Sequence, residues 1–499
     1  MEMMMRAAGN DDVMPEKLIN TGFGYGFATQ QNPSWNLEQI LLATGGRLSA
    51  GECHASFCGI STDSRTVKAG DIFLALAGVN YDGTRFVNDA LKKGAAGVIV
   101  NGPLPAFSAS IPVVVVNDTL AALGDLAAYR RSIMRNLKVL AVTGSSGKTT
   151  VKDMAASILS TCGRVIKTSK NYNNLIGLPL SLLPVSYSHD FAVLEMGMNA
   201  PGEIARLTEI ADPEVACINN VHPAHLEGLG DIAGVARAKG ELFVHCRSSA
   251  TLVVNIDDPY ARRLSRKSTQ ELITFGRRKD AAIRATHIHN NGVSGSSFTL
   301  HIDSKKKRVR LGALGEHNVL NGLAAAAMAW AVGADISQIA AGLEKFTPAD
   351  NRLQLMQLRN GLQVVNDSYN ANPASMRAAL TAVQKLGKGK KRIAVLGDML
   401  ELGDFSIAAH AEIGEDAARQ GFDFLVTVGD YAKTMAVAAR KAGMKQDRAV
   451  ALANHKDVAA LLKELLAINS IAAGDLLLLK GSRGMKMEKI VELLDEINS

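Results

Sequence analysis

The stretch Leu137–Thr150, LKVLAVTGSSGKTT, decides the expected fold of this chain. Residues 137–142 are mostly apolar, which is typical of a buried parallel strand. The glycine-containing segment TGSSGKTT follows, and the residues after it, VKDMAASILSTCG, place apolar side chains at helical spacing. In this order, glycines let backbone N–H groups approach phosphate oxygens, and the helix N-terminus adds partial positive charge. The stretch therefore predicts a triphosphate-binding loop.

Residue types within the loop suit particular tasks. Lys148 is expected to reach the outer phosphates, and the Thr149 hydroxyl is expected to hold magnesium. The spacing departs from the common P-loop, because Gly144 and Gly147 enclose two residues instead of four. A glycine turn that merely begins a helix is the alternative; the flanking strand and helix favour nucleotide binding. The expected nucleotide-binding loop residues are Thr143, Gly144, Ser145, Ser146, Gly147, Lys148, Thr149 and Thr150.

Composition limits the class of protein. The 499 residues are 47% hydrophobic and 21% charged, which suits a soluble globular protein of about three domains. The net charge is +7 but aromatic residues make up only 5%, so anionic small molecules are favoured as partners over nucleic acid. The basic run Lys305–Arg310, KKKRVR, lies between alternating apolar stretches. We interpret it as a solvated hairpin turn rather than a nucleic-acid patch.

Cysteine usage and hydropathy favour a cytoplasmic protein. The cysteines are Cys53, Cys58, Cys162, Cys217 and Cys246. They show neither zinc spacing nor a disulfide framework, so a reducing compartment fits. No apolar run is long enough for a transmembrane segment; the best candidate, 323–334, is too short. The N-terminus lacks the apolar core of a signal peptide, and residues 1–33 are expected to form a loose extension.

A small α/β domain is expected before the glycine loop. Apolar runs predict strands at 72–76 and 96–100, with a helix at 86–93 between them. Ahead of these strands lies STDSR, in which Arg65 can grip a phosphate as a two-pronged fork. In isolation, a polar turn with a local ion pair is the favoured alternative. A helix near 120–132 ends this domain.

Polar side chains follow the next predicted strands. Glu195 ends the strand at 191–196, and His225 follows the strand at 214–220. Ligands collect at the carboxyl ends of strands in an open α/β sheet, so both residues are expected beside the glycine loop as magnesium ligands. A structural role is the alternative for a lone histidine.

Asparagines mark two further segments. KNYNNLIGLP contains Asn173 and Asn174, whose amides can orient a reacting phosphate or carboxylate, although asparagine-rich turns are also common. GEHNVLN opens an alanine-rich helix in which Asn318 and Asn321 can read an adenine edge. Helix capping by Asn318 is the structural alternative.

A third domain is expected after a proline-containing linker at 346–352, FTPADNR. The remaining sequence repeats strand and helix, which predicts a doubly wound domain of Rossmann type. No G-x-G-x-x-G follows its first strand, so a nicotinamide cofactor is not expected.

Together these motifs resemble the Mur ligases, a family of ATP-dependent amide-forming enzymes of peptidoglycan precursor synthesis. TGSSGKTT carries the shortened glycine spacing of the family, and Glu195, His225, AKGELF around Lys239, GEHNVLN and Arg352 follow in its order. The resemblance covers roughly residues 36–497. It implies an α/β fold with a UDP-sugar-binding domain (34–134), a central ATP-binding domain with a parallel sheet (135–347) and a Rossmann-like ligase domain (348–499).

Other motifs are similar to those of the branch that adds D-alanyl-D-alanine to UDP-N-acetylmuramoyl-tripeptide. They are TDSR, GDIFLAL, AHLEGLG, NDSYNANPASM, LGDMLELG and KGSRGMKME. The resemblance implies those two substrates, ATP and Mg²⁺ as cofactors, an acyl phosphate intermediate, a cytoplasmic location and a monomer, without nucleic acid as a partner. One departure is Thr84, where relatives often have histidine.

The resemblance also implies residue roles. Lys148 and Thr149 would bind ATP phosphates and magnesium, Glu195 and His225 would ligate magnesium, and Lys239 would be carbamylated by CO₂ to help hold a second magnesium. Asn173 or Asn174 would contact the reacting phosphate. Around the nucleotide, the implied contacts are Asn318 and Asn321 at the adenine, Arg352 at the phosphates and Asp367 at the ribose. The implied substrate contacts are Ser64 and Arg65 at the uridine diphosphate, and Ser368, Asn370, Asn372 and Ser482 at the dipeptide.

Two alternatives remain at this point. A folylpolyglutamate synthetase shares the loop spacing and reaction type but needs no TDSR domain. A non-enzymatic P-loop binding protein would tolerate loss of Glu195, Lys239 and Arg352.

Overall fold

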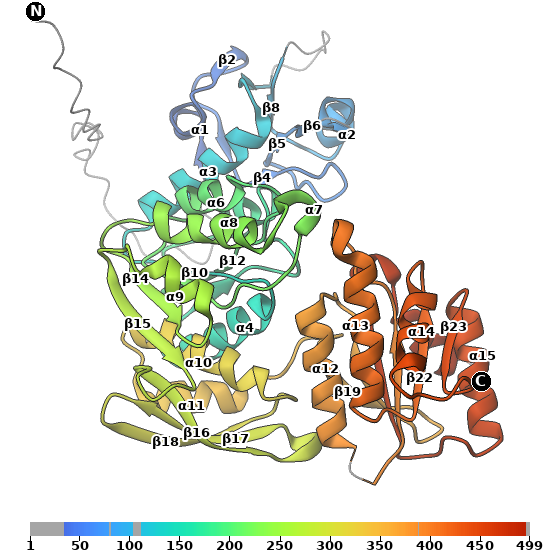
Figure 1. Cartoon of the computed structure of the whole chain (residues 1–499). Coiled ribbons are helices and arrows are strands. Elements are labelled where there is room, and N and C mark those ends of the chain that lie inside the picture. The colour runs from blue at the N-terminus through green and yellow to red at the C-terminus, as the bar shows by residue number, and fades with distance from the viewer. Residues whose placement is uncertain (1–33, 79–80, 103–110, 388, 496–499) are drawn as a thin grey trace, which may run out of the picture.

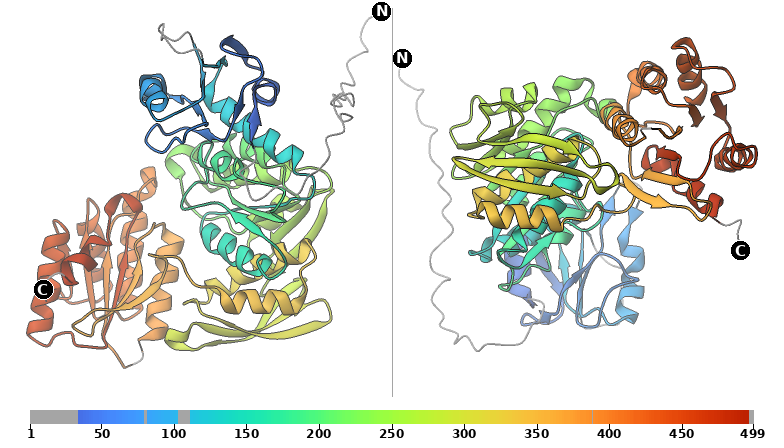
Figure 2. Two further views of the ribbon diagram at one scale, coloured as in Figure 1. Left: turned by 180° about the vertical axis from the view of Figure 1, so that it is seen from behind. Right: turned by 90° about the horizontal axis from the view of Figure 1, so that it is seen from below.

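The structure, a computed structural model, describes residues 34–78, 81–102, 111–387 and 389–495 (Figure 1). Three large sheets of five, nine and six strands follow one another along the chain, and each forms the centre of one domain (Figures 1 and 2). This confirms the predicted three-domain α/β fold. The predicted extension, residues 1–33, lies outside the described residues.

The N-terminal domain contains a five-stranded sheet in the order β2-β9-β8-β5-β4. The predicted strands at 72–76 and 96–100 are β5 and β8, which pair in parallel and are fully buried. Its principal elements are α1 (Leu37–Thr44), β2 (Arg47–Ala50), β4 (Ile60–Ser61), β5 (Ile72–Leu74), α2 (Val87–Lys92), β8 (Gly97–Val100), β9 (Val113–Val115) and α3 (Thr119–Ile133). Short strands complete it: β1 (Trp35–Asn36), β3 (Ser56–Phe57), β6 (Ala77–Gly78) and β7 (Tyr81–Asp82).

The central domain contains a nine-stranded sheet in the order β11-β12-β10-β13-β14-β15-β16-β17-β18. Strands β11 to β16 pair in parallel, and β16, β17 and β18 pair antiparallel. The strands are β10 (Lys138–Thr143), β11 (Val165–Lys167), β12 (Phe191–Glu195), β13 (Val215–Ile218), β14 (Thr251–Asn255), β15 (Glu271–Gly276), β16 (Ile283–Asn290), β17 (Ser296–Ile302) and β18 (Lys305–Leu311). The helices are α4 (Lys148–Leu159), α5 (Gly177–Leu182), α6 (Glu203–Ala211), α7 (Leu226–Leu229), α8 (Ile232–His245), α9 (Pro259–Ser265), α10 (His317–Ala331) and α11 (Ile336–Lys345).

Strand β10 lies between β12 and β13, and its residues 139–142 are fully buried. A strand covered on both faces needs a continuous apolar run, which explains the sequence VLAV. Helices α4, α10 and α11 share one apolar core with the sheet, while α5, α6 and α8 belong to the core on its other face. The glycine loop therefore leaves the sheet from a buried interior strand.

One sequence expectation in this domain is wrong. The basic run Lys305–Arg310 is not a hairpin turn but most of strand β18, and the turn lies before it at Asp303 and Ser304. Val309 and Leu311 face the apolar core, which is sufficient to hold β18 against β17 despite its charge.

The C-terminal domain contains a six-stranded sheet in the order β19-β20-β24-β21-β22-β23, parallel except for β19. This is the predicted doubly wound arrangement. Its strands are β19 (Gln354–Gln357), β20 (Gln363–Asp367), β21 (Arg392–Leu396), β22 (Phe424–Val428), β23 (Ala449–Leu452) and β24 (Leu476–Lys480). Its helices are α12 (Pro373–Leu386), α13 (Ser406–Arg419), α14 (Ala432–Lys441), α15 (His455–Ala467) and α16 (Lys489–Asp495).

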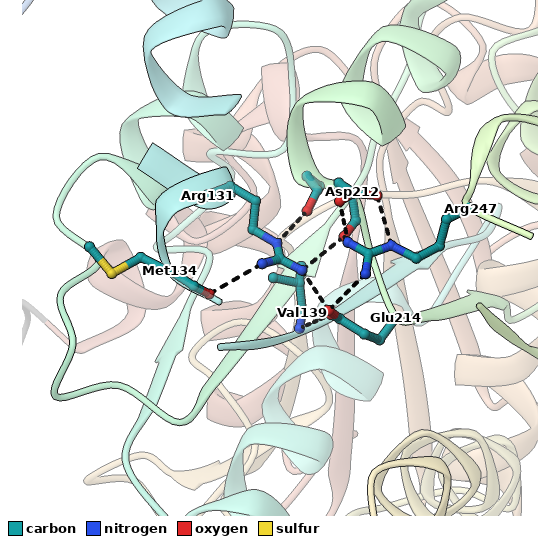
Figure 3. Close-up of polar contacts among 7 residues, drawn as sticks. Arg131, Met134, Val139, Asp212, Glu214 and Arg247 are labelled. Carbon is teal, nitrogen blue, oxygen red and sulfur yellow. Dashed lines mark hydrogen bonds and ion pairs between the residues drawn. The ribbon is translucent and has the colours of Figure 1, made fainter. Parts of the chain in front are cut away.

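A buried charge network joins the N-terminal and central domains (Figure 3). Arg131, in the last turn of α3, donates to the Glu214 carboxylate at 2.6 Å and to the backbone oxygen of Ala211 at 3.2 Å. Glu214 also accepts from the backbone N–H of Val139 in β10 at 2.7 Å. Arg247 reaches Glu214 from the other side at 3.3 Å. The network fastens the end of the N-terminal domain to the strand that carries the glycine loop.

Two further expectations can be compared with the described part of the chain. All five cysteines are free thiols. Among the described residues, no helix is long and apolar enough to cross a membrane.

Candidate active site

A cavity of about 780 Å³ lies between the central and C-terminal domains. Its walls come from the glycine loop, the segments after β12, β13 and β14, the start of α10, and residues near the carboxyl ends of β20 and β24. The carboxyl ends of the parallel strands of two sheets thus supply its polar groups, as expected for open α/β sheets.

The glycine loop turns directly into helix α4. Gly147 has φ 75° and precedes the first turn of α4. A Cβ atom there would lie 2.4 Å from Asn321 Oδ1 and 2.8 Å from Asn219 Nδ2, so only glycine fits. Lys148 donates to the Gly144 carbonyl at 2.9 Å. Burial lowers the pKa of Lys148, and the nearby Glu195 carboxylate opposes this shift.

Loop residues on either side of this turn differ in exposure to the cavity. Ser145 to Thr150 line it, whereas Thr143 is buried beneath the loop and donates to the Met196 carbonyl at 2.8 Å. Thr143 therefore supports the loop from below.

Glu195 lies at the centre of a series of hydrogen-bonded polar side chains, here called the polar chain. Its carboxylate accepts from the Thr149 hydroxyl at 2.6 Å and from the Asn173 amide at 2.8 Å, and the residue is 3% exposed. A hydroxyl beside a carboxylate is a donor set that suits Mg²⁺, which completes its shell with water and phosphate oxygens. Among the described residues, no cluster of three or more His, Cys, Asp or Glu could hold a metal by itself. The donors present fit a magnesium ion shared with a phosphate ligand.

The structure separates the two candidate asparagines. Asn173 points to Glu195, whereas the Asn174 side-chain oxygen accepts from the backbone N–H groups of Gly177 and Ile176, at the start of α5. Asn174 thus makes a local turn, and Asn173 is the one bonded to the polar chain.

Lys239 lies in α8 and is fully buried. Its amine is 3.5 Å from the Met198 sulfur, and no carboxylate of the described residues pairs with it within 4 Å. Burial, with the Lys148 cation, lowers the pKa of Lys239 well below its ordinary value. Burial therefore favours the neutral amine, which is the form that reacts with CO₂.

His225 follows β13 and lines the same cavity as the glycine loop. It directly precedes α7 and has φ 55°. Its Nδ1 is 2.6 Å from Oε2 of Glu401, which belongs to the C-terminal domain. This contact is the first cause of a lowered pKa at Glu401. His225 lines the cavity but faces across the domain boundary.

Arg352 links the linker to the glycine loop. Asn351 and Leu353, on either side of it, have φ 61° and 48°. Its guanidinium donates to the Thr149 hydroxyl at 2.8 Å and stacks on the Tyr369 ring at 3.9 Å. With both neighbouring residues in the left-handed conformation, the Arg352 side chain extends from the linker toward the glycine loop.

Asp367 ends β20 and is held from two directions. One carboxylate oxygen accepts from the Leu353 backbone N–H at 3.1 Å, and the other lies 2.6 Å from the amine of Lys480. Lys480 is 2% exposed and also donates to the Asn370 carbonyl at 2.8 Å. These bonds fix the carboxylate at the cavity wall.

Asn318 and Asn321 lie in the first turns of α10 and line the cavity. Asn318 donates to the Leu314 carbonyl and accepts from Asn321. The residue at the N-cap is Glu316, so the alternative that Asn318 caps the helix is wrong.

The predicted dipeptide contacts divide into two pairs. Asn370 and Asn372 line the cavity, and Asn372 also donates to the Ser145 carbonyl of the glycine loop at 3.2 Å. Ser368 is fully buried and Ser482 is 3% exposed, and neither lines the cavity. The Ser482 hydroxyl accepts from the Leu400 backbone N–H at 2.9 Å, which supports the segment carrying Glu401.

Ser64 and Arg65 lie in the N-terminal domain outside the cavity. Arg65 pairs with Asp63 at 2.8 Å, and this contact lowers the pKa of Asp63 to about 2. The geometry is that of the polar turn with a local ion pair.

Asn219, Tyr369, Glu401 and Lys480 are among the cavity or boundary residues that sequence reasoning missed. Tyr369 and Lys480 lie inside the motifs NDSYNANPASM and KGSRGMKME, so their position in a motif was the available signal. Glu401 lies in LGDMLELG, but nothing in that segment points to His225.

Comparison with known proteins defines the class. Three family models match in chain order: the Mur ligase family catalytic domain at residues 56–131, the Mur ligase middle domain at 142–329 and the Mur ligase glutamate ligase domain at 351–483. The chain belongs to the Mur ligase family.

Individual relatives and solved structures within this family are similar to most of the chain. The chain is 37% identical to the UDP-N-acetylmuramoyl-tripeptide–D-alanyl-D-alanine ligase of Escherichia coli K12, across 88% of this chain and 93% of that protein. The crystal structure of MurF from Acinetobacter baumannii is 34% identical, with a TM-score of 0.87, covering 94% of this chain and all of that one. MurF ligase from Thermotoga maritima in complex with ADP is 27% identical, with a TM-score of 0.76 over 88% of this chain and 97% of that one.

Proposed function

We propose that this protein joins D-alanyl-D-alanine to UDP-N-acetylmuramoyl-tripeptide in an ATP-dependent reaction that releases ADP and phosphate. The observation that carries the proposal is the convergence of Thr149, Glu195 and Arg352 in one cavity between two domains. Its support includes the names of the related proteins, each a ligase for these two substrates, and the ADP bound by the Thermotoga relative.

The glycine loop would hold the triphosphate. Backbone N–H groups of the first turn of α4 would face the phosphates, and Lys148 and Arg352 would add positive charge. Asn318 and Asn321 would contact the adenine, and Asp367 the ribose; all three line the cavity, and Lys480 fixes the Asp367 carboxylate.

Magnesium would be held by Thr149 and Glu195, with His225 as a further candidate. Carbamylation of Lys239 would add a carboxylate for a second ion. Bound magnesium neutralises phosphate charge during transfer. Asn173 would keep the Glu195 carboxylate oriented, because its amide donates to one of the two oxygens.

The chemistry follows from the substrates. A peptide carboxylate is a poor electrophile, so its oxygen first attacks the γ-phosphorus of ATP; the bond to ADP breaks and an acyl phosphate forms. The amine then attacks the acyl carbon, and phosphate leaves as the amide forms and a proton is lost. No protein nucleophile is needed, and catalysis consists of positioning and charge neutralisation.

The domains would divide this work. We place the boundaries near 34–134, 135–347 and 348–499, for the UDP-sugar, ATP and amine-substrate domains. Ser64 and Arg65 would contact uridine diphosphate, and Asn370 and Asn372 the dipeptide. Ser368 and Ser482 would support these contacts from below. We further propose that the protein acts as a monomer in the cytoplasm.

The direct test is phosphate release measured with each substrate omitted in turn. Release should require ATP, the muramyl tripeptide and D-alanyl-D-alanine together. A panel with diaminopimelate or lysine as the third residue would identify the natural peptide. Phosphate release that continues when either the muramyl tripeptide or D-alanyl-D-alanine is omitted would contradict the proposal.

A further inference from the structure

The three antiparallel strands β16, β17 and β18 carry a concentration of positive charge. Residues 283–311 contain six lysines and arginines and one aspartate, a net charge of +5 in a chain whose total is +7. These strands lie at the end of the central domain opposite the N-terminal domain (Figure 1). In the view from below, no helix crosses in front of them (Figure 2).

Strand register places four of these six lysines and arginines on one face. Side chains at alternate positions, including Ile283, Leu300 and Val309, pack into the core shared with α10 and α11. The opposite face, here called the basic sheet face, carries Arg284, His301, Lys306, Arg308 and Arg310. Arg284, His301 and Lys306 form one cross-strand row. Lys306, Arg308 and Arg310 continue along β18 for about 13 Å.

The cations of this face lack acidic partners. None of its lysines or arginines forms an ion pair within 4 Å with a carboxylate of the described residues. Arg308 instead donates to the Ser297 hydroxyl and the His287 carbonyl. Elsewhere, exposed arginines commonly pair, as Arg278 does with Asp280 at 2.9 Å.

The immediate surroundings do not neutralise this charge. Glu344 of α11 accepts from the backbone N–H of Arg310, not from its guanidinium. Burial, followed by the charges of Arg284 and Lys306, lowers the pKa of His301, which lies between these two residues in the cross-strand row.

Protection of a free sheet edge is the simpler explanation for lysines on β18. It does not account for Arg284, which lies on β16, two strands from the edge. Moreover, the backbone N–H of Arg310 at that edge already donates to the Glu344 carboxylate. The charge is therefore a property of the face and not of the edge strand alone.

The chemistry of the face selects among anionic partners. Phe298 is the only Phe, Trp or Tyr in residues 283–311, and it is fully buried, so no aromatic ring is available to stack on bases. A flat array of lysine and arginine side chains suits a flat anionic surface, which attracts basic residues without specific pockets. We propose that the basic sheet face binds the anionic lipid surface of a membrane reversibly.

The test measures co-sedimentation of the full chain with vesicles of phosphatidylglycerol and phosphatidylcholine, and with vesicles of phosphatidylcholine alone. The triple variant Lys306→Gln/Arg308→Gln/Arg310→Gln is compared with Lys433→Gln/Lys441→Gln/Lys445→Gln. The control removes the same charge from exposed positions of the C-terminal domain that form no ion pair within the described residues. Each basic residue near an anionic surface changes partitioning by about fivefold.

We expect the wild type and the control variant to co-sediment with anionic vesicles and not with neutral ones. The basic-face variant should lose on the order of a hundredfold in partitioning while keeping its turnover. Binding should also weaken as salt rises from 50 to 300 mM, roughly in step with charge screening. Equal loss in both triple variants, no binding by wild type, or stronger face-dependent binding to duplex DNA or RNA than to vesicles would overturn the proposal.

Discussion

Oε2 of Glu401 in the C-terminal domain lies 2.6 Å from Nδ1 of His225 in the central domain. Both residues have left-handed backbones, with φ of 65° and 55°. Other polar contacts span the same boundary, among them those from Arg352 to Thr149 and from Asn372 to the Ser145 carbonyl. These two end on residues of the glycine loop. We therefore expect nucleotide binding and the placement of the C-terminal domain to be coupled.

Glu401→Gln tests this coupling. It keeps the shape but removes the charge facing His225, so we expect kcat/KM to fall by about tenfold, or about 1.4 kcal/mol. The free energy of unfolding should change by less than about 1 kcal/mol, because the Glu401 side chain is 54% exposed. Glu415→Gln, which removes an exposed pair with Arg419 in the same domain, is the control and should leave both quantities unchanged. An unaltered kcat/KM in Glu401→Gln would refute the coupling.

Lys148→Ala should abolish phosphate release with little effect on thermal unfolding. The lysine amine donates to the Gly144 carbonyl of its own loop, a local contact, whereas loss of a phosphate clamp costs more than a tenfold change in rate. Lys138→Ala, at the exposed start of β10, is the matched control. Residual turnover above about a tenth of wild type would contradict the assignment of the loop.

Lys239→Ala should be almost inactive and should recover part of its activity in the presence of a short carboxylic acid. The added acid replaces the anion that carbamylation would supply in this buried site. The same acid should not rescue Lys148→Ala, which lacks a cation. A purely structural role for Lys239 predicts loss of stability and no rescue.

Arg131 and Arg247 offer a paired test of the network in Figure 3. Arg131 is 5% exposed, so Arg131→Met leaves the Glu214 carboxylate partly unpaired and should cost about 3 kcal/mol of unfolding free energy. Arg247 is 32% exposed, and Arg247→Met should cost less than about 1 kcal/mol. Denaturant unfolding measures both values. Equal costs would show that burial does not set the strength of this network.

The sequence was sufficient where a signal is local. Buried strands such as β10 and β12 need continuous apolar runs, and the polar residues just after them, Lys148, Thr149 and Glu195, lie in the cavity as expected. Strand β18 was missed because only Val309 and Leu311 mark its buried side among basic residues. Periodicity is too weak a signal over so short a half-polar strand.

Contacts across the domain boundary could not be predicted. Glu401 is far along the chain from His225, and their contact depends on how the third sheet is placed against the second. Lys480 pairs with Asp367 inside the third sheet, but the two residues are 113 positions apart in the sequence, so the pair required the strand order. Which of Asn173 and Asn174 bonds to Glu195 likewise required the side-chain directions, since the two are adjacent in one turn.

The most direct measurement of the central claim is ADP release combined with mass spectrometry of the peptide product. The account predicts release with UDP-N-acetylmuramoyl-tripeptide plus D-alanyl-D-alanine, and a product heavier by the dipeptide less one water. Diaminopimelate, in contrast, calls for a guanidinium and a carboxylate at its distant zwitterionic end, whereas Asn370 and Asn372 offer neutral amides at the cavity wall. Release with UDP-N-acetylmuramoyl-dipeptide plus a diamino acid, and little with tripeptide plus D-alanyl-D-alanine, would contradict the proposed function while leaving the family unchanged.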